Sequence, residues 1–175
     1  DVDVRFMRDI TLADVAPLPS HYAIGPEATP GMVSLAHAGR RIAYGNAGVM
    51  LINLPAMART YKRFVRWVFS PGHLAAGRHF GVFGPLAQGA FNEYYQGKFA
   101  LHTYPTFNHK PYWGHDPAAK LVHFHGPKRA DYASYLHNRS WSGSPLYLSL
   151  LRGCTRRSGC SRYLDVYDKL AREVR

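Results

Sequence analysis

The sequence predicts an α/β fold, for three reasons. Short apolar runs with β-branched residues alternate with segments whose apolar residues recur at helical spacing. Stretches rich in glycine and proline separate these elements. Apolar residues make up 46% of the 175-residue chain and aromatic residues 14%, which is enough for a real core and excludes a largely disordered chain.

The first 31 residues are predicted to form a strand followed by a loop. Residues 1–7 alternate acidic and apolar side chains and then become apolar, as in a strand that ends at a polar rim. Residues 8–15 are predicted as a turn or a short helix. Residues 16–31 contain prolines at four positions and glycines at two, so the sequence predicts a loop there.

The middle of the chain is predicted to form buried strands followed by two helices. Residues 42–54 are mostly apolar and contain a Gly-Asn-Ala-Gly corner, which fits one or two strands in the interior of a sheet. Apolar residues at helical spacing predict a helix over 56–70, and Pro71-Gly72 is expected to end it. A second helix is predicted over 86–96.

The rest of the chain is predicted as a loop, a strand and a helix. Residues 99–114 are rich in aromatic side chains and are predicted as a loop. Residues 120–124 are predicted as a short strand, and the apolar spacing of 163–174 predicts a helix.

The net charge of +11, from 22 Lys and Arg against 11 Asp and Glu, favours an anionic partner. Nucleic acid, an anionic membrane face and a phosphate-bearing ligand all fit that charge. The basic residues are scattered, however, and most are interpreted as solvated faces. Because the chain has no RNP motif, zinc finger or basic zipper, and no basic stripe interleaved with aromatic residues, a nucleic-acid partner is disfavoured.

The start of the chain and its cysteines bear on its cellular setting. Residues 1–4 are acidic rather than a basic leader, and they open on a strand typical of a core, so we expect sequence upstream. Cys154 and Cys160 can close a small loop through a disulfide, which favours an oxidising compartment such as the lumen of the endoplasmic reticulum or Golgi. Asn138 begins an Asn-Arg-Ser glycosylation pattern, which also occurs by chance.

Asp1 and Asp3 are candidate ligands of a divalent cation. At the end of a strand the following turn lets both carboxylates of an Asp-x-Asp triplet reach one hard cation, either directly or through water. Mg²⁺ and Mn²⁺ prefer such oxygen ligands and commonly bind substrate phosphates as well. The alternative interpretation is a pair of exposed turn carboxylates, since such triplets are common.

His123 lies on an apolar strand that is followed at once by Gly126, Pro127 and Lys128. The glycine allows backbone N–H groups to approach a phosphate closely, and the lysine can neutralise it. This arrangement suits a diphosphate. The alternative is a core histidine with ordinary hydrogen bonds, and His125 ranks lower than His123 as a candidate.

Asn46 is the third candidate for a functional residue. It lies between Gly45 and Ala47-Gly48, where a closely packed corner would present its amide to sugar hydroxyls. An asparagine in a left-handed turn is the alternative.

Five segments, in this order, resemble glycosyltransferase family 8, the group that contains glycogenin and bacterial galactosyltransferases. DVDVRFMRDI resembles the D-x-D strand of the family, and GNAGVMLINL resembles its N-A-G-V-M-L segment. AQGAFNEYYQGKF resembles the D-Q-G-x-x-N helix, YPTFNHKPYW the turn that ends in Asn, and LVHFHGPKR the closing H-F-x-G motif.

The resemblance implies a GT-A-like fold, which is a Rossmann-like mixed sheet flanked by helices, here without the N-terminal strands that bind the nucleotide. Residues 1–130 would form the metal, diphosphate and acceptor side, and residues 131–175 a helical extension of the same domain. The implied reaction is a metal-dependent transfer of a sugar, with retained configuration, from a nucleoside-diphosphate donor to a hydroxyl of a glycan or protein acceptor.

The resemblance also implies roles for individual residues. Asp1, Asp3 and His123 would bind Mn²⁺ or Mg²⁺. The residues that would contact the diphosphate and the transferred sugar are Gly126, Lys128, Asn46 and Gln88. Of these, Lys128 would stabilise the charge that develops on the leaving group.

Two departures from the family pattern bear on activity. Ala87 stands where the family usually has Asp before Gln-Gly, so a carboxylate near the reacting sugar is absent. The loop from His123 to Lys128 is one residue shorter than in glycogenin-like members. An alternative function is therefore a catalytically inactive subunit of a larger assembly, in which a protein partner or an upstream segment covers the open sheet edge.

Overall fold

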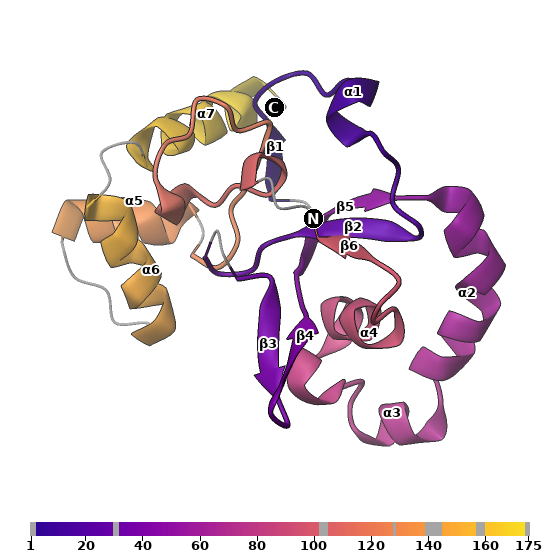
Figure 1. Ribbon diagram of the computed structural model, residues 1–175. Coiled ribbons are helices and arrows are strands. Elements are labelled where there is room, and N and C mark those ends of the chain that lie inside the picture. Colours follow the sequence, from indigo (N-terminus) through magenta and orange to yellow (C-terminus); the bar gives the residue numbers. More distant parts are fainter. Residues whose placement is uncertain are drawn as a thin grey trace. The chain divides into compact units, whose positions relative to one another are not determined.

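The structure is a computed structural model that describes residues 3–29, 32–101, 105–127, 129–138, 145–156 and 160–173. The chain has a mixed α/β fold with small sheets and helices, in agreement with the predicted class (Figure 1). It divides into two compact units: residues 1–9 with 106–175 form the first, and residues 10–105 form the second. The predicted boundary at residue 130 lies inside the first unit.

In the first unit a short antiparallel sheet pairs a strand near the N-terminus with a strand more than 100 residues later in the sequence. Strand β1 (Val4–Phe6) pairs with β7 (Leu121–His123), so that Val4 lies opposite His123. The backbone of His109 extends this pairing, because its N–H donates to Leu121 and its carbonyl accepts from the N–H of His123. The strand predicted over 120–124 is confirmed, and its end fixes the position of His123.

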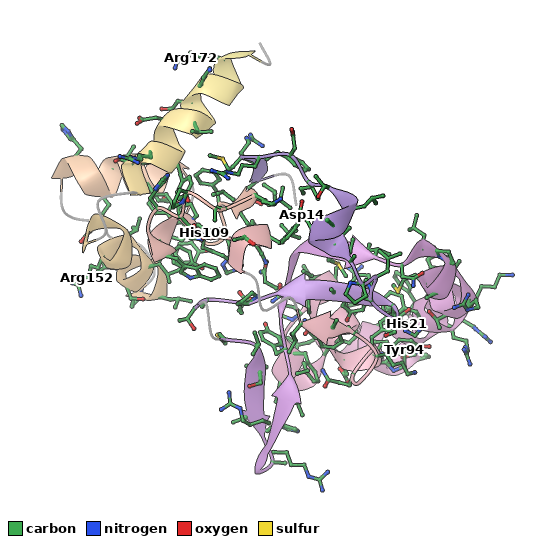
Figure 2. The ribbon with its side chains drawn as sticks, turned by 45° about the horizontal axis from the view of Figure 1, so that its top comes forward. Asp14, His21, Tyr94, His109, Arg152 and Arg172 are labelled. Atoms are coloured by element: carbon green, nitrogen blue, oxygen red, sulfur yellow. The ribbon has the colours of Figure 1, made fainter. Side chains whose placement is uncertain are left out.

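An aromatic core fills the first unit and is covered by α5 (Arg129–Asn138), α6 (Pro145–Arg156) and α7 (Cys160–Glu173) (Figure 1). Tyr163 of α7 is buried, and its hydroxyl donates to the carbonyl of Asp116 and accepts from the N–H of the same residue. His109 points into this unit, whereas Arg152 and Arg172 are exposed on α6 and α7 (Figure 2). The predicted disulfide and glycosylation site fall on side chains of Cys154, Cys160 and Asn138, which lie outside the described part.

The second unit contains a mixed sheet of three strands in the order β5-β2-β6. The central strand β2 (Tyr22–Gly25) is antiparallel to β5 (Asn46–Ile52) and parallel to β6 (Ala100–Leu101). A separate hairpin consists of β3 (Ser34–His37) and β4 (Arg40–Ala43). Strands β4 and β5 therefore account for most of the segment predicted as one or two buried strands. The predicted Gly-Asn-Ala-Gly corner at 45–48 needs a correction, because Asn46 already belongs to β5 and only Tyr44 and Gly45 connect the two strands.

The prediction of a loop over 16–31 was wrong, because this segment contains the central strand β2. All four residues of β2 are buried. The prolines at positions 19 and 26 flank the strand and do not interrupt it, so they remove no hydrogen bond from the ladder. In the predicted loop 99–114, β6 and the 3₁₀ turns Pro105–Phe107 and Pro111–Trp113 add short regular elements.

Helices α2 (Leu54–Val68) and α4 (Leu86–Tyr94) cover the sheet of the second unit, with α3 (Pro71–Ala75) between them in the sequence (Figure 1). The side chain of Asn53 caps α2 by accepting from the N–H of Ala56 at 3.2 Å. The rings of Phe64 and Phe91 stack with centroids 5.0 Å apart and join α2 to α4. Both predicted helices are confirmed.

The predicted end of the first helix at Pro71-Gly72 needs a correction. Helix α2 ends at Val68, and Pro71 lies in the first turn of α3, where a proline replaces an N–H that has no helical partner. A further short helix, α1 (Leu12–Val15), lies in the segment predicted as a turn or helix. No helix in the described ranges is long and apolar enough to cross a membrane.

Candidate functional site

The predicted site residues that the structure describes fall into two polar clusters, one in each unit. The histidine cluster of the first unit consists of Asp3, His123, Asn108 and Lys110. The amide cluster of the second unit consists of Asn46, Gln88, Glu27, Tyr44 and Asn92.

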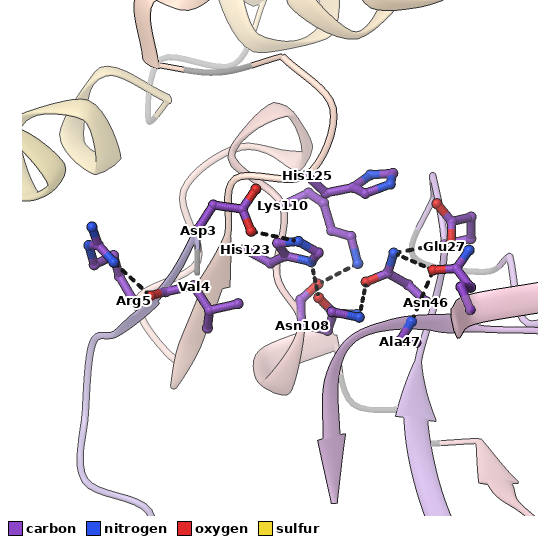
Figure 3. Close-up of polar contacts among 12 residues, drawn as sticks. Asp3, Val4, Arg5, Glu27, Asn46, Ala47, Asn108, Lys110, His123 and His125 are labelled. Carbon is purple, nitrogen blue, oxygen red and sulfur yellow. Dashed lines mark hydrogen bonds and ion pairs between the residues drawn. The ribbon is translucent and has the colours of Figure 1, made fainter. Parts of the chain in front are cut away.

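In the histidine cluster, Asp3 and His123 are brought together by the pairing of β1 with β7. The carbonyl of Asp3 accepts from the N–H of Phe124 at 2.9 Å, which continues the ladder beyond the strand. The carboxylate Oδ1 of Asp3 then lies 3.2 Å from Nε2 of His123 (Figure 3). The predicted convergence of this carboxylate and this imidazole, which are far apart in the sequence, is confirmed.

The second ring nitrogen of His123 has a partner of its own. Nδ1 lies 3.0 Å from the amide Oδ1 of Asn108, a residue that is fully buried (Figure 3). Burial of the ring, followed by the charge of Lys110, lowers the pKa of His123 to about 3, and the nearby Asp3 carboxylate only partly opposes this shift. At neutral pH the imidazole is therefore uncharged, although it lies beside a carboxylate.

Lys110 is a fully buried cation beside this histidine. Its Nζ donates to the carbonyl of Asn108 at 3.0 Å and lies 4.9 Å from the centre of the Trp113 ring, so both a hydrogen bond and a cation–π contact hold it. Sequence reasoning did not identify Lys110 or assign a role to Asn108, although both lie in a segment quoted for the resemblance. The predicted cation Lys128 lies outside the described residues.

The geometry of Asp3 and His123 fits two ligands of one metal ion. A neutral imidazole carries one proton, and the oxygen of Asn108 holds that proton on Nδ1. The lone pair of Nε2 then lies 3.2 Å from a carboxylate oxygen of Asp3, and both atoms are of a kind that binds a divalent cation.

The described residues supply only part of the ligand set that was predicted for a metal. Within the part of the chain that the structure describes, no group of three or more His, Cys, Asp or Glu side chains could hold a metal ion. The predicted third ligand, Asp1, lies outside that part. A histidine that binds a metal commonly donates its other N–H to an oxygen, and Asn108 can accept in this way.

The loop after β7 contains the other predicted residues of this region. His125 is hydrogen-bonded through Nδ1 to the hydroxyl of Tyr112 at 3.1 Å, and its ring centre lies 5.4 Å from that of His123. Gly126 has a φ of 80°, a conformation that a residue with a side chain rarely adopts. The glycine is therefore required for the turn, and its contact with a phosphate stays a prediction.

In the amide cluster, Asn46 and Gln88 meet at a buried carboxylate. Asn46 Nδ2 donates to Oε2 of Glu27 at 3.2 Å, and Gln88 Nε2 donates to the same oxygen at 2.9 Å (Figure 3 shows the Glu27 contact of Asn46). The two amides also bond directly, from Asn46 Nδ2 to Gln88 Oε1 at 3.1 Å. The structure thus brings together two residues that the resemblance assigned to the transferred sugar.

The backbone at the start of β5 holds this cluster in place. Gln88 Oε1 accepts from the N–H of Ala47 at 3.0 Å. Asn92 of α4 exchanges hydrogen bonds with both backbone groups of Gly45, at 2.9 and 2.8 Å. A Cβ on Gly45 would lie 2.7 Å from the carbonyl of Gly25, so this corner requires a glycine.

Tyr44 completes the amide cluster. Its hydroxyl accepts from Gln88 Nε2 at 2.8 Å. Burial, with the nearby charge of Glu27, raises the pKa of Tyr44, so the phenol stays protonated at neutral pH. Gln88 Nε2 therefore contacts both a phenol oxygen and a carboxylate, and its orientation is fixed.

Glu27 was missed by sequence reasoning, but the composition contains a cue for it. It is the only carboxylate between Asp14 and Glu93, and it is 91% buried, with 9% exposed. Buried carboxylates are rare unless they are paired, and Glu27 accepts from two amides. Although Ala87 supplies no carboxylate, the amide cluster contains one. Rigidly held carboxylate and amide groups are suited to binding hydroxyl-rich ligands.

Comparison with protein-family models, with curated proteins and with solved structures finds no match to this chain.

Proposed function

We propose that this chain is the metal-binding and acceptor-side part of a metal-dependent retaining glycosyltransferase, similar to glycosyltransferase family 8 and with a GT-A-type fold. The reaction would move a sugar from a nucleoside-diphosphate donor to an acceptor hydroxyl. The contact between Asp3 and His123 carries this proposal. The motif order assigns both residues to one metal ion, and their side chains lie 3.2 Å apart although 119 residues separate them in the sequence.

In the first unit, Asp3 and His123 together with Asp1 would hold Mn²⁺ or Mg²⁺. The ion would neutralise charge on the departing diphosphate. Asn108 orients the imidazole by accepting its Nδ1 proton. Lys128 would provide a positive charge for the diphosphate oxygens.

In the second unit, Asn46 and Gln88 would contact the donor sugar. Glu27 orients both amides, because a single carboxylate oxygen accepts a hydrogen bond from each. The hydrogen bonds of Gln88 to Ala47 and Tyr44 hold its amide as well, so its direction is fixed before a ligand arrives, which lowers the entropy lost on binding. The mixed sheet around β2, covered by α2 and α4, supports the GT-A-type assignment.

A binding experiment tests the proposal. The thermal midpoint of the chain is measured with nucleoside-diphosphate sugars in the presence and absence of Mn²⁺. We expect stabilisation that requires the metal, of about 3–4 kcal/mol at a hundredfold to thousandfold excess of ligand over its Kd. Asp3→Asn and His123→Gln should each remove the shift, whereas His109→Gln, a buried histidine of the same unit, should retain it. A shift independent of the metal, or one that survives both ligand variants, would contradict the proposal.

Ala87 favours a second candidate, a binding subunit that has lost catalysis. In that case the chain binds the donor with metal but neither transfers nor hydrolyses the sugar. Ala87 is exposed at the start of α4, so Ala87→Asp should be tolerated by the fold. Transfer that appears only in Ala87→Asp would identify a disabled enzyme, and transfer by the unmodified chain would exclude this candidate.

A further inference from the structure

We propose that the exposed face of helix α2, together with the apolar pocket at its C-terminal end, is a docking surface for an anionic phospholipid bilayer. The face consists of Arg59, Lys62 and Arg66 with Phe69. The surface lies within the second unit and contains none of the residues of the amide cluster. Binding of a bilayer at this surface therefore does not require that the chain transfers a sugar.

The charge of the surrounding segment is entirely positive. Between Glu27 and Glu93 the chain has seven Lys and Arg residues and no Asp or Glu. No ion pair neutralises the α2 cations within the described part of the chain. Such a surface attracts anions, and juxtaposed Lys and Arg side chains each strengthen binding to an anionic bilayer about fivefold.

The helical spacing places these cations on one stripe with an aromatic side chain. Arg59, Lys62, Arg66 and Phe69 stand at positions i, i+3, i+7 and i+10, and all four are exposed. The opposite face of α2 packs into the core through Phe64. Phe69 is 52% exposed, although it is a large apolar residue. Helix α2 thus presents charge and apolar surface outward together, at one flank of the second unit (Figure 1).

An apolar pocket of about 200 Å³ lies next to this stripe. Phe69 forms part of its wall, together with Val65, Phe91, Leu86 and Arg78. This volume suits a few methylene groups rather than a whole lipid. Because Arg78 is the single charged residue of the lining, the pocket combines an apolar interior with a cation at its wall.

The backbone around the pocket is strained in a way that exposes an apolar side chain. Arg78 and Leu86 have φ values of 57° and 60°, which bulky residues rarely adopt. A hydrogen bond of 3.0 Å from the N–H of Leu86 to the carbonyl of Arg78 holds the two residues together. Leu86 remains 59% exposed. Strain of this kind persists where the surrounding structure enforces it, often at ligand-binding sites.

The combination of exposed cations, exposed apolar side chains and an apolar pocket favours a bilayer over nucleic acid or an acidic protein as the partner. Bilayers present phosphate groups above hydrocarbon, which matches cations beside Phe69, Leu86 and an apolar pocket. Nucleic acid would require aromatic rings interleaved with the cations to stack bases, and the stripe has a single ring at one end.

Co-sedimentation with lipid vesicles tests the proposal. We expect the chain to bind vesicles that contain phosphatidylserine, with affinity falling as salt rises, and to bind phosphatidylcholine vesicles weakly. Lys62→Gln with Arg66→Gln should weaken binding about 25-fold. The charge-matched control, Arg40→Gln with Arg41→Gln on the exposed start of β4, should weaken it less than about threefold.

A second pair of variants tests how much the exposed apolar side chains contribute to vesicle binding. Phe69→Ser should weaken vesicle binding, whereas Leu12→Ser, at a residue that is 86% exposed in the same unit, should not. Thermal melts show whether each variant is folded. Equal losses in the two charge pairs, no binding to anionic vesicles, or tighter binding to heparin or RNA than to vesicles would overturn the proposal.

Discussion

The Nε2 atom of His123 lies 3.2 Å from the Oδ1 atom of Asp3, across the pairing of β1 with β7. The contact is set by strand register, because Val4 lies opposite His123 and the carbonyl of Asp3 bonds to the N–H of Phe124. The pairing of the backbones thus brings the carboxylate of Asp3 next to the ring of His123. The metal prediction depends on this register.

Removal of Asn108 should weaken metal binding without removing a ligand. In Asn108→Ala the Nδ1 proton of His123 loses its acceptor, so the ring no longer favours the tautomer that leaves Nε2 free to bind. We expect the affinity for Mn²⁺ to fall about 10–100-fold, measured by isothermal titration calorimetry. Asn53→Ala, which removes the cap of α2 in the other unit, should lower stability and leave Mn²⁺ affinity unchanged. Equal affinities of Asn108→Ala and the unmodified chain would refute the role of Asn108.

Asn92 should be essential for stability. Its fully buried side chain bonds both backbone groups of Gly45, and Asn92→Ala leaves this N–H and carbonyl buried without partners. We expect the free energy of unfolding to fall by about 2–4 kcal/mol, measured by urea denaturation. Lys62→Ala, on the exposed face of α2, should change it by less than about 0.5 kcal/mol. A loss below about 1 kcal/mol for Asn92→Ala would show that water replaces the amide.

The elements with strong periodicity could be predicted from the sequence, and those defined by long-range contacts could not. Helices α2 and α4 have apolar faces that repeat at helical spacing, and both were predicted. Strand β2 has four residues between prolines, and it is a strand because β5 and β6 pair with it on both sides. The local composition around β2 does not indicate that β5 and β6 pair with it.

The same distinction applies to the candidate sites. Asp3, His123, Asn46 and Gln88 were identified from motifs, and the structure joins them in pairs. Glu27 could not be linked to these amides from the sequence, because it lies 19 residues before Asn46 and 61 before Gln88. The bond to Asn46 follows from the pairing of β2 with β5, which places Gly25 opposite Asn46, and the bond to Gln88 follows from the packing of α4 against β5.

The two glycines Gly89 and Gly72 should respond in opposite ways to the same substitution. A Cβ on Gly89 would lie 2.1 Å from the carbonyl oxygen of Gly84, so Gly89→Ala must displace the backbone. We expect a loss of about 2–3 kcal/mol or more. Gly72 has no atom within 4 Å of the added Cβ, so Gly72→Ala should raise stability by about 0.4–1 kcal/mol. Urea denaturation of both variants measures their free energies of unfolding. If both variants lose a similar amount of stability, the close packing of α4 against Gly84 is contradicted.

Stability should fall as the pH falls below neutral, partly because of His109. This ring is buried, and Nε2 lies 2.6 Å from the carbonyl of Gly114, while Nδ1 has no hydrogen-bond partner among the described residues. Burial lowers the pKa of His109, since a proton on Nδ1 would be a buried charge without an acceptor. Below the ordinary pKa of about 6.5 the unfolded chain binds a proton on this histidine and the folded chain does not, so the free energy of unfolding decreases as the pH falls toward the folded pKa. In His109→Gln the amide can still donate to Gly114, and this part of the pH dependence should disappear. Urea denaturation between neutral pH and pH 5 measures the difference, and identical slopes for the two proteins would show that His109 binds its proton in the folded state.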